Sequence, residues 1–235
     1  MSINPDLPQD SPYAIRRELL RPNLNTFIFD LDGVIINSEP LHLQMANDIL
    51  EPHGIEIPWL DYEPFIGGKD IDFYRYVQQL APLKLTAEEL VADYKHRLDV
   101  YFNEAVSVPI IPDIVNLVKC LYSEGWRLAV ASSSSHVNIR HVLRAAGLID
   151  YFPVQVSGED VCNGKPAPDI YLEAVAQLGA TAAESVAIED SCAGTISAST
   201  AGLYTIGFQH AGSGKQDLSQ ADLIIDRIGK LLQRK

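Results

Sequence analysis

The chain has 235 residues, of which 47% are hydrophobic and 21% charged, an ordinary composition for a folded globular protein. At about 150 residues per domain, this length predicts one large domain or one domain with an insert. Transmembrane proteins are excluded because no apolar run is long enough to cross a bilayer. The 18 Lys and Arg residues against 31 Asp and Glu give a net charge of −13, which argues against general binding to nucleic acid.

The cysteines and the N-terminal segment carry compartment signals. Cys120, Cys162 and Cys192 are scattered and form no Cys-x-x-Cys pair, so we expect reduced thiols rather than a disulfide framework or a zinc site. The first 25 residues are rich in Pro and Asp and contain no continuous apolar stretch, which predicts a loosely packed polar lead-in and not a secretory signal. Both observations favour a cytoplasmic protein.

Short apolar runs alternate with helical patterns along most of the chain. Helices are predicted over 112–124, 136–146, 168–178 and 192–200, and strands over 26–30, 127–131, 153–157, 185–189, 203–206 and 222–225. This alternation is typical of an α/β fold with a Rossmann-like parallel sheet covered by helices on both faces.

Residues 41–107 interrupt this rhythm, because they contain helical patterns over 71–80 and 86–103 and no buried strand. Thr86 and Glu89 form a capping box at the start of the second helix. An insert directly after the first strand lies at the sheet edge where such folds bind ligands. We therefore expect an all-helical cap domain over 38–107 and a core domain over 1–37 plus 108–235, with a basic closing helix over 230–235.

Chemically active side chains follow four of the predicted strands. Taken alone, each could be a turn, capping or solvated loop residue. Because the carboxyl ends of parallel strands meet at one edge of a sheet, we expect these side chains to lie together. They are Asp30 and Asp32 after the first strand, Ser132 after the second, Lys165 after the third, and Glu189 and Asp190 after the fourth.

This combination of groups is suited to phosphoryl transfer. Grouped carboxylates repel one another unless a cation is bound, and carboxylate oxygens are ligands that Mg²⁺ prefers. Ser132 and nearby backbone amides can hydrogen-bond an anion at a helix start. Lys165 can offset the charge of both the anion and a carboxylate. Phosphoryl transfer depends mainly on such positioning and charge neutralisation.

Four segments in the same order resemble the motifs of the haloacid dehalogenase (HAD) superfamily: 30–34 (DLDGV), Ser132, 164–169 (GKPAPD) and 188–194 (IEDSCAG). The helical insert after the first strand is similar to that of the subclass with a helical cap, which includes β-phosphoglucomutase-like phosphatases. The resemblance covers roughly residues 25–225.

The resemblance implies a role for each motif residue. Asp30 would be the nucleophile that forms an aspartyl-phosphate, and Asp32 the general acid and base. Mg²⁺ would be held by Asp30, the backbone carbonyl of Asp32 and Asp190, with Glu189 as a direct or indirect ligand. Phosphate would contact Gly33, Ser132, Ser133 and Lys165. The family's dehalogenases lack the second aspartate, so Asp32 favours phosphate chemistry.

Four residues of the insert are candidates for substrate contact. The segment 65–70 (FIGGKD) resembles the specificity loop of the cap, in which Gly68 and Lys69 would face the substrate. His42 and Arg97 lie near positions where β-phosphoglucomutases carry cap histidine and cationic residues. Lys69 could equally be solvated, and a structural contact is somewhat favoured for His42.

These patterns favour a Mg²⁺-dependent phosphatase acting on a small phosphorylated metabolite, with a sugar phosphate as one possibility. The alternative is β-phosphoglucomutase-type transfer of the phosphoryl group between sugar hydroxyls. A receiver-like signalling module is disfavoured, since receivers carry the phosphoacceptor on a later strand and have no helical cap. The glycine-rich segment 207–215 does not match a phosphate-binding P-loop, because Gln216 replaces the required Ser or Thr, and it is predicted to be a surface loop. We expect no membrane partner and a monomer or weak dimer.

Overall fold

The computed structural model describes residues 7–8, 10–66, 68–81, 83–104 and 107–235, and its core is a six-stranded parallel sheet with the order β4-β3-β2-β5-β6-β7. The strands are β2 (Thr26–Phe29), β3 (Arg127–Ser132), β4 (Val154–Ser157), β5 (Ser185–Glu189), β6 (Tyr204–Phe208) and β7 (Leu223–Ile225). The predicted α/β fold with a parallel sheet is confirmed. The chain leaves β2 toward β3 and β4 and then returns to place β5 on the other side of β2, so the strand order reverses at β2.

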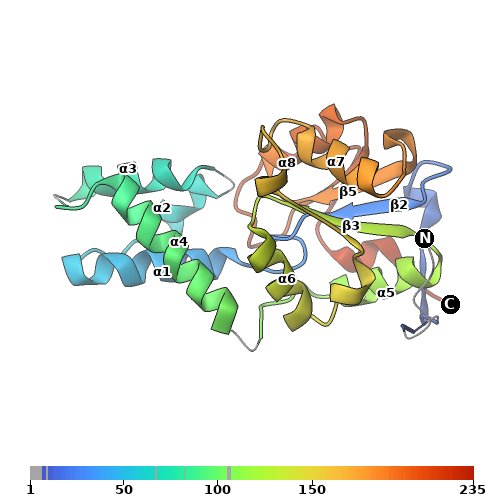
Figure 1. Cartoon of the computed structure of the whole chain (residues 1–235), viewed down its shortest axis with the longest axis horizontal. Helices are drawn as coiled ribbons and strands as arrows, with labels where there is room; N and C mark the ends of the chain where they lie inside the picture. The colour runs from blue at the N-terminus through green and yellow to red at the C-terminus, as the bar shows by residue number, and fades with distance from the viewer. Residues whose placement is uncertain (1–6, 9, 67, 82, 105–106) are drawn as a thin grey trace.

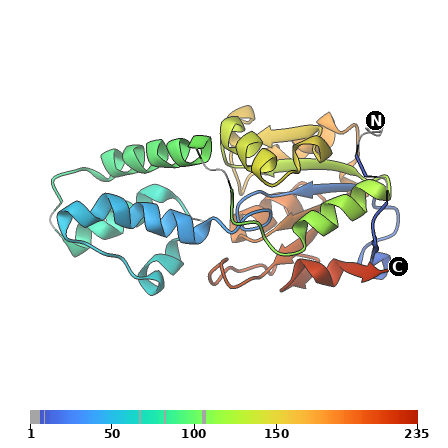
Figure 2. The ribbon, with the colours of Figure 1, turned by 90° about the horizontal axis from the view of Figure 1, so that it is seen from below.

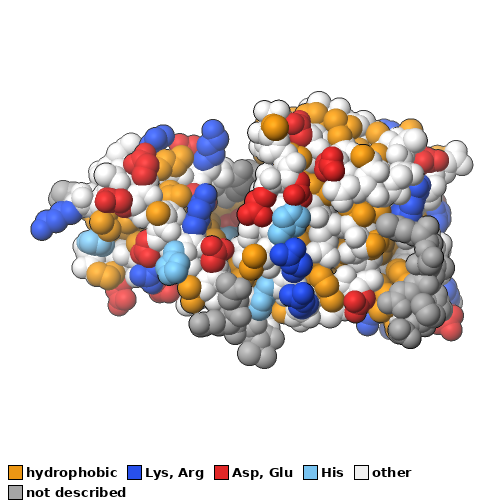
Figure 3. Space-filling model, in the orientation of Figure 1, with side chains coloured by type: hydrophobic (Ala, Val, Ile, Leu, Met, Phe, Trp, Pro, Cys, Tyr) orange, Lys and Arg blue, Asp and Glu red, His pale blue; other side chains and the backbone are white. Residues whose placement is uncertain are grey.

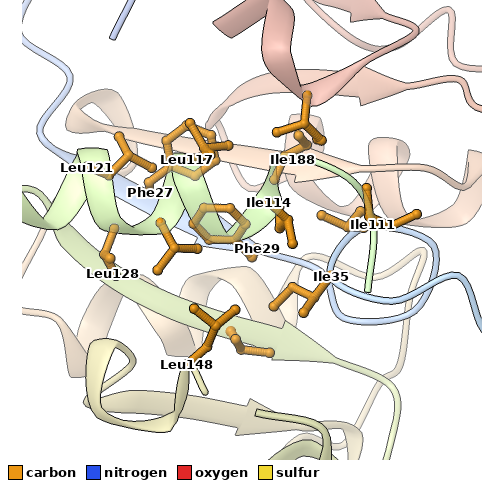
Figure 4. Packing of buried hydrophobic residues seen from close by; sticks show 14 of the residues in the cluster. Phe27, Phe29, Ile35, Ile111, Ile114, Leu117, Leu121, Leu128, Leu148 and Ile188 are labelled. Carbon is orange, nitrogen blue, oxygen red and sulfur yellow. The ribbon is translucent and has the colours of Figure 1, made fainter. Parts of the chain in front are cut away.

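Helices cover both faces of the sheet, and the residues of each strand alternate between the two layers (Figure 1). Large side chains such as Phe27 and Phe29 face the layer of α5 (Ile114–Ser123) and α6 (His136–Ala145), as Figure 4 shows for the α5 side. Ile28 and small residues such as Ala129 face α7 (Asp169–Gln177) and α8 (Cys192–Thr200). The sheet is therefore buried on both faces, as its continuous apolar strands require.

The segment between β2 and α5 folds into a separate group of helices at one end of the molecule (Figure 2). It comprises α1 (Glu39–Leu50), α2 (Trp59–Tyr62), α3 (Asp70–Leu80) and α4 (Ala87–Glu104), which share their own hydrophobic cluster. The capping box is present before α4, since Glu89 N donates to Thr86 Oγ1 at 3.2 Å and Thr86 N donates to Glu89 Oε2 at 2.8 Å. The domain boundaries at 38 and 107 stay a prediction.

The two ends of the described chain correct two expectations. β1 (Tyr13–Ile15) pairs antiparallel with β8 (Leu232–Arg234), so the predicted closing helix is replaced by the end of a short 3-10 helix and a strand, and the described N-terminal residues from Tyr13 onward are packed against the core. Ile15, Leu20 and Leu24 are buried in the core cluster, where they cover α5 and the edge of the sheet. The pairing partner of each strand lies at the opposite end of the sequence, which no local pattern could indicate.

Short 3-10 helices connect the main elements, at Arg17–Leu19, Glu51–His53, Glu63–Phe65, Ile149–Tyr151, Gly158–Asp160, Ala182–Glu184 and Ile228–Leu231. Among the described residues no helix has the length and apolar character to span a membrane. Cys120, Cys162 and Cys192 are unpaired, as expected.

Candidate active site

Asp30 directly follows β2 at the position where the strand order reverses. The flanking strands β3 and β5 are in register with β2, with Phe29 opposite Val130 and Ile188, and Asp30 N donates to Ile188 O at 3.1 Å. The carboxyl ends of three central strands therefore bring their terminal polar residues to one edge, where open α/β sheets bind ligands.

Lys165 connects two of these carboxylates. Its Nζ lies 2.7 Å from Asp30 Oδ1 and 2.5 Å from Glu189 Oε1, and it also donates to Ala131 O at 3.1 Å. Burial alone would lower the pKa of Lys165, but the charges of Asp30 and Glu189 outweigh this effect and raise it. Lys165 is therefore a fixed positive charge against Asp30.

Glu189 is fully buried, and both of its carboxylate oxygens already accept hydrogen bonds. Besides Lys165, Tyr171 Oη donates to Glu189 Oε1 at 2.5 Å, and Ser191 Oγ donates to Oε2 at 3.3 Å. A Cβ atom at Gly194 would lie 2.0 Å from the carboxyl carbon of Glu189, so only glycine fits at that position of α8. These contacts hold the Glu189 carboxylate in place beside Lys165.

Asp30, Glu189 and Asp190 each offer a carboxylate oxygen within 4.8 Å of the others. Burial, and next the charge of Glu189, raise the pKa of both Asp30 and Asp190 well above the ordinary value. One lysine cannot balance three buried carboxylates, so a divalent cation would stabilise their charged forms. The oxygen-only donor set suits a hard cation such as Mg²⁺.

A close turn brings Gly33 against this cluster. Gly33 has a φ of +76°, and a Cβ atom on it would lie 1.9 Å from Asp190 Oδ2, so glycine is required for both conformation and space. His210 Nε2 lies 3.8 Å from the same Asp190 Oδ2. Burial lowers the pKa of His210, which favours its neutral form.

The serines after β3 lie beside Asp32. Ser134 Oγ donates to Asp32 Oδ2 at 2.8 Å, and Ser134 N donates to the buried Ser132 Oγ at 3.1 Å. This loop leads into α6, whose first turn is capped by Ser135 through Asn138 N. Ser132 and Asp32 are thus held at the same edge by one short loop.

A cavity of about 490 Å³ opens between this edge and the cap helices. In the space-filling view a constriction separates the two lobes at this level of the molecule (Figure 3). The sheet side of the cavity is lined by Asp30, Asp32, Ser132, Ser133, Lys165, Pro166, Asp190, Ser191, Ala193 and Gln216. The cap side is lined by Glu39, Ile66, Gly68, Lys69 and Asp72. Gly67 of the predicted specificity loop lies outside the described residues.

Two predicted cap residues are not among those that line the cavity. His42 Nδ1 pairs with Tyr94 Oη at 2.5 Å inside the cap, and Arg97 is exposed and forms an ion pair with Asp93 at 3.2 Å. The proposed contacts of His42 and Arg97 with substrate stay predictions.

Sequence reasoning missed several residues of the site. Tyr171 lies in the apolar stripe of a helix, which is typical of a core residue. Ser134 is one of four consecutive serines that the sequence does not distinguish, and Glu39 has the position of an ordinary first residue of a helix. Gln216 follows the segment 207–215 that was predicted to be a surface loop; Gly212 and Ser213 of that loop are buried, so this prediction was wrong in part. This loop packs inward although it lacks the sequence of a P-loop.

Comparison with known proteins finds relatives over most of the chain. The family model described as haloacid dehalogenase-like hydrolase matches residues 27–208. The β-phosphoglucomutase of Bacillus subtilis is 30% identical over 88% of this chain and 92% of its own length. The phosphorylated carbohydrates phosphatase of Thermotoga maritima is 27% identical over 86% of this chain and 93% of its own length.

The fold also matches solved structures. CbbY from Rhodobacter sphaeroides in complex with phosphate superposes with a TM-score of 0.74 at 25% identity, covering 88% of this chain and 96% of that chain. The chain therefore belongs to the haloacid dehalogenase-like hydrolase family. Within it, the chain is a phosphoric monoester hydrolase of the β-phosphoglucomutase-like subclass, as the motifs predicted.

Proposed function

We propose that this protein is a Mg²⁺-dependent phosphatase that hydrolyses a small phosphorylated metabolite through a phosphoryl intermediate on Asp30. The observation that carries the proposal is the position of Asp30. Its carboxylate lies 2.7 Å from Lys165 Nζ at the floor of a cavity that the cap closes from above. A carboxylate held in this way has one oxygen paired with a cation and the other free to attack.

In the first step, Asp30 attacks the phosphorus atom in line with the leaving alkoxide, so a P–O bond to Asp30 forms as the ester P–O bond breaks. Asp32 gives a proton to the leaving oxygen, which departs as an alcohol. Ser134, whose hydroxyl donates to Asp32 at 2.8 Å, keeps that carboxyl group turned toward the cavity. Ser132, Ser133 and Lys165 neutralise and hold the transferring phosphoryl oxygens.

In the second step, Asp32 takes a proton from water, and the resulting nucleophile attacks the phosphorus of the intermediate. The P–O bond to Asp30 breaks, inorganic phosphate leaves, and Asp30 is restored as a carboxylate.

Asp30, Asp190 and the backbone carbonyl of Asp32 are the groups proposed to hold Mg²⁺, which would supply positive charge against the phosphate. Glu189 acts mainly on Lys165, since its oxygens already accept from Lys165, Tyr171 and Ser191. The substrate is proposed to be a sugar phosphate, because the relatives named above include a β-phosphoglucomutase and a phosphorylated carbohydrates phosphatase.

A panel of phosphorylated metabolites, with p-nitrophenyl phosphate as a general substrate, tests this proposal. Wild type is expected to release phosphate with Mg²⁺ and to stop with EDTA, and Asp30→Asn to be inactive. Equal rates for wild type and Asp30→Asn would contradict the assignment of the nucleophile. The alternative of phosphoryl transfer between sugar hydroxyls is tested with glucose 1-phosphate primed by a bisphosphate: formation of glucose 6-phosphate without net phosphate release would establish a mutase.

A further inference from the structure

Gln216 lines the cavity and lies outside the four family motifs. It lies within the loop between β6 and β7, half-buried at the boundary between the core and the cap. We propose that Gln216 is a positioning residue that latches the cap loop around Ile66 to the N-terminus of α8, and so holds Gly68 and Lys69 over the bound substrate. The kinetic part of this inference rests on the proposed function.

The two ends of the Gln216 carboxamide bind different lobes. On the core side, Gln216 Oε1 accepts from Cys192 N at 3.0 Å. Cys192 begins α8, so its amide has no partner within the helix, and the carboxamide supplies one. On the cap side, Gln216 Nε2 donates to Ile66 O at 2.8 Å. One rigid planar group therefore fixes the spacing between the cap and the helix that follows Asp190.

The loop carrying Gln216 also packs against the same part of the cap. A Cβ atom at Gly214 would lie 3.1 Å from Ile66 Cδ1 and 3.3 Å from Glu63 Cγ, so the loop backbone approaches the cap closely. Gln209 Nε2 donates to Gly214 O at 2.9 Å and braces the loop from the core side. The latch is thus held at both ends by groups other than the substrate.

This arrangement affects substrates according to their size. Gly68 and Lys69 follow the latched residue by a few positions and line the cap side of the cavity. A metabolite whose carbon skeleton reaches the cap can contact Gly68 and Lys69, which the latch holds in place before the metabolite binds. A small ester held only by its phosphate makes no such contact with the cap. Gln216 should therefore contribute to the binding of larger substrates and leave the chemistry at Asp30 unchanged.

Two substitutions separate the latch from a simple capping role. Gln216→Glu keeps an oxygen acceptor for Cys192 N, where the helix N-terminus favours negative charge, but it replaces the donor to Ile66 O by a second acceptor. Gln216→Ala removes both bonds. If Gln216 served only to cap α8, Gln216→Glu would behave as wild type. If it is a latch, Gln216→Glu should be impaired at least as much as Gln216→Ala.

The experiment measures kcat and KM of wild type, both variants and the control Gln220→Glu, an exposed position that carries the same charge change. For the best metabolite of the panel, we expect Gln216→Glu to raise KM by about two- to tenfold, the fold-change of one net hydrogen bond, with kcat unchanged. The decrease in kcat/KM should be smaller for p-nitrophenyl phosphate than for the metabolite, and all constants of Gln220→Glu should change less than about twofold. Wild-type KM in Gln216→Glu, or an equal loss with both substrates, would overturn the proposal.

Hydrogen exchange provides a readout that does not require activity. In Gln216→Glu, the backbone amides of 68–70 should exchange faster while Cys192 N stays protected, and in Gln216→Ala both regions should exchange faster. Unchanged exchange at 68–70 in both variants would overturn the latch whatever the enzyme's substrate proves to be. A failure of the proposed phosphatase activity would leave this measurement intact.

Discussion

Removing Lys165 by substitution with Met tests whether the buried charge cluster is balanced as the structure indicates. The Lys165 side chain is 8% exposed, that of Asp30 is 10% exposed and that of Glu189 is fully buried, with Nζ to oxygen distances of 2.7 and 2.5 Å. Met fills a similar volume and removes only the charge and its hydrogen bonds. Breaking a buried ion pair of this kind costs about 3–5 kcal/mol, because the remaining carboxylates are left without compensation.

The expected result is a decrease of about 3–5 kcal/mol in the free energy of unfolding, measured by urea denaturation in EDTA near neutral pH. The loss should shrink toward acidic pH, since Asp30 and Asp190 can then be protonated. The double variant Lys165→Met/Glu189→Gln should recover part of the stability, with a coupling of about 0.5–3 kcal/mol. A decrease below about 1 kcal/mol, as for an exposed ion pair, would refute the interpretation of the cluster.

Three further predictions follow from the site. Gly194→Ala places a methyl group 2.0 Å from the carboxyl carbon of Glu189 and should lower the free energy of unfolding by about 1–3 kcal/mol and abolish most of the activity. The control Gly164→Ala, whose Cβ would have no atom within 4 Å, should change neither stability nor activity. A fully active Gly194→Ala enzyme would contradict the described packing. In the metal-free protein, burial and next the charge of Glu189 raise the pKa of Asp30 and Asp190 above 3.8. These groups therefore bind protons more tightly in the folded state, and their contribution to stability declines as the pH rises from 3.8 to the raised pKa values. Mg²⁺ should therefore raise the Tm more at about pH 8 than at about pH 5, and a hundredfold excess over Kd should add about 2.7 kcal/mol to the free energy of unfolding. An equal Tm shift at both pH values would argue against binding at these carboxylates. Ser134→Ala removes the 2.8 Å hydrogen bond to Asp32 and should lower kcat about two- to tenfold at unchanged KM. The control Ser123→Ala removes a hydrogen bond to Cys120 O outside the cavity lining and should leave kcat and KM unchanged. A raised KM with normal kcat in Ser134→Ala would assign Ser134 to substrate binding instead.

The sheet and the motif residues on it could be predicted because their signals are local. Each strand is a short apolar run, and Asp30, Ser132, Glu189 and Asp190 lie at or directly after a strand end. Once the strands are parallel, geometry brings these residues to one edge. The family resemblance then orders them into a site.

The features that could not be predicted from the sequence depend on contacts between distant segments. β1 and β8 pair from opposite ends of the chain, and Gln216 acts by reaching Ile66 150 residues away. Tyr171 has the spacing of a core residue, and only the structure reveals its hydroxyl on Glu189. Such roles arise from tertiary packing and leave no trace in local periodicity or turn chemistry.

Oligomeric state and cellular compartment stay predictions from the sequence. Size-exclusion chromatography with light scattering would test the expected monomer or weak dimer.

The most direct test of the central claim is to trap the phosphoryl intermediate during turnover. Wild type and Asp32→Asn are mixed with substrate and Mg²⁺, quenched in acid, digested and analysed by mass spectrometry. We predict one added phosphoryl group on Asp30, absent from Asp30→Asn and longer-lived in Asp32→Asn, in which activation of water is impaired. A phosphoryl group on another residue, or steady phosphate release by Asp30→Asn at the wild-type rate, would contradict the account.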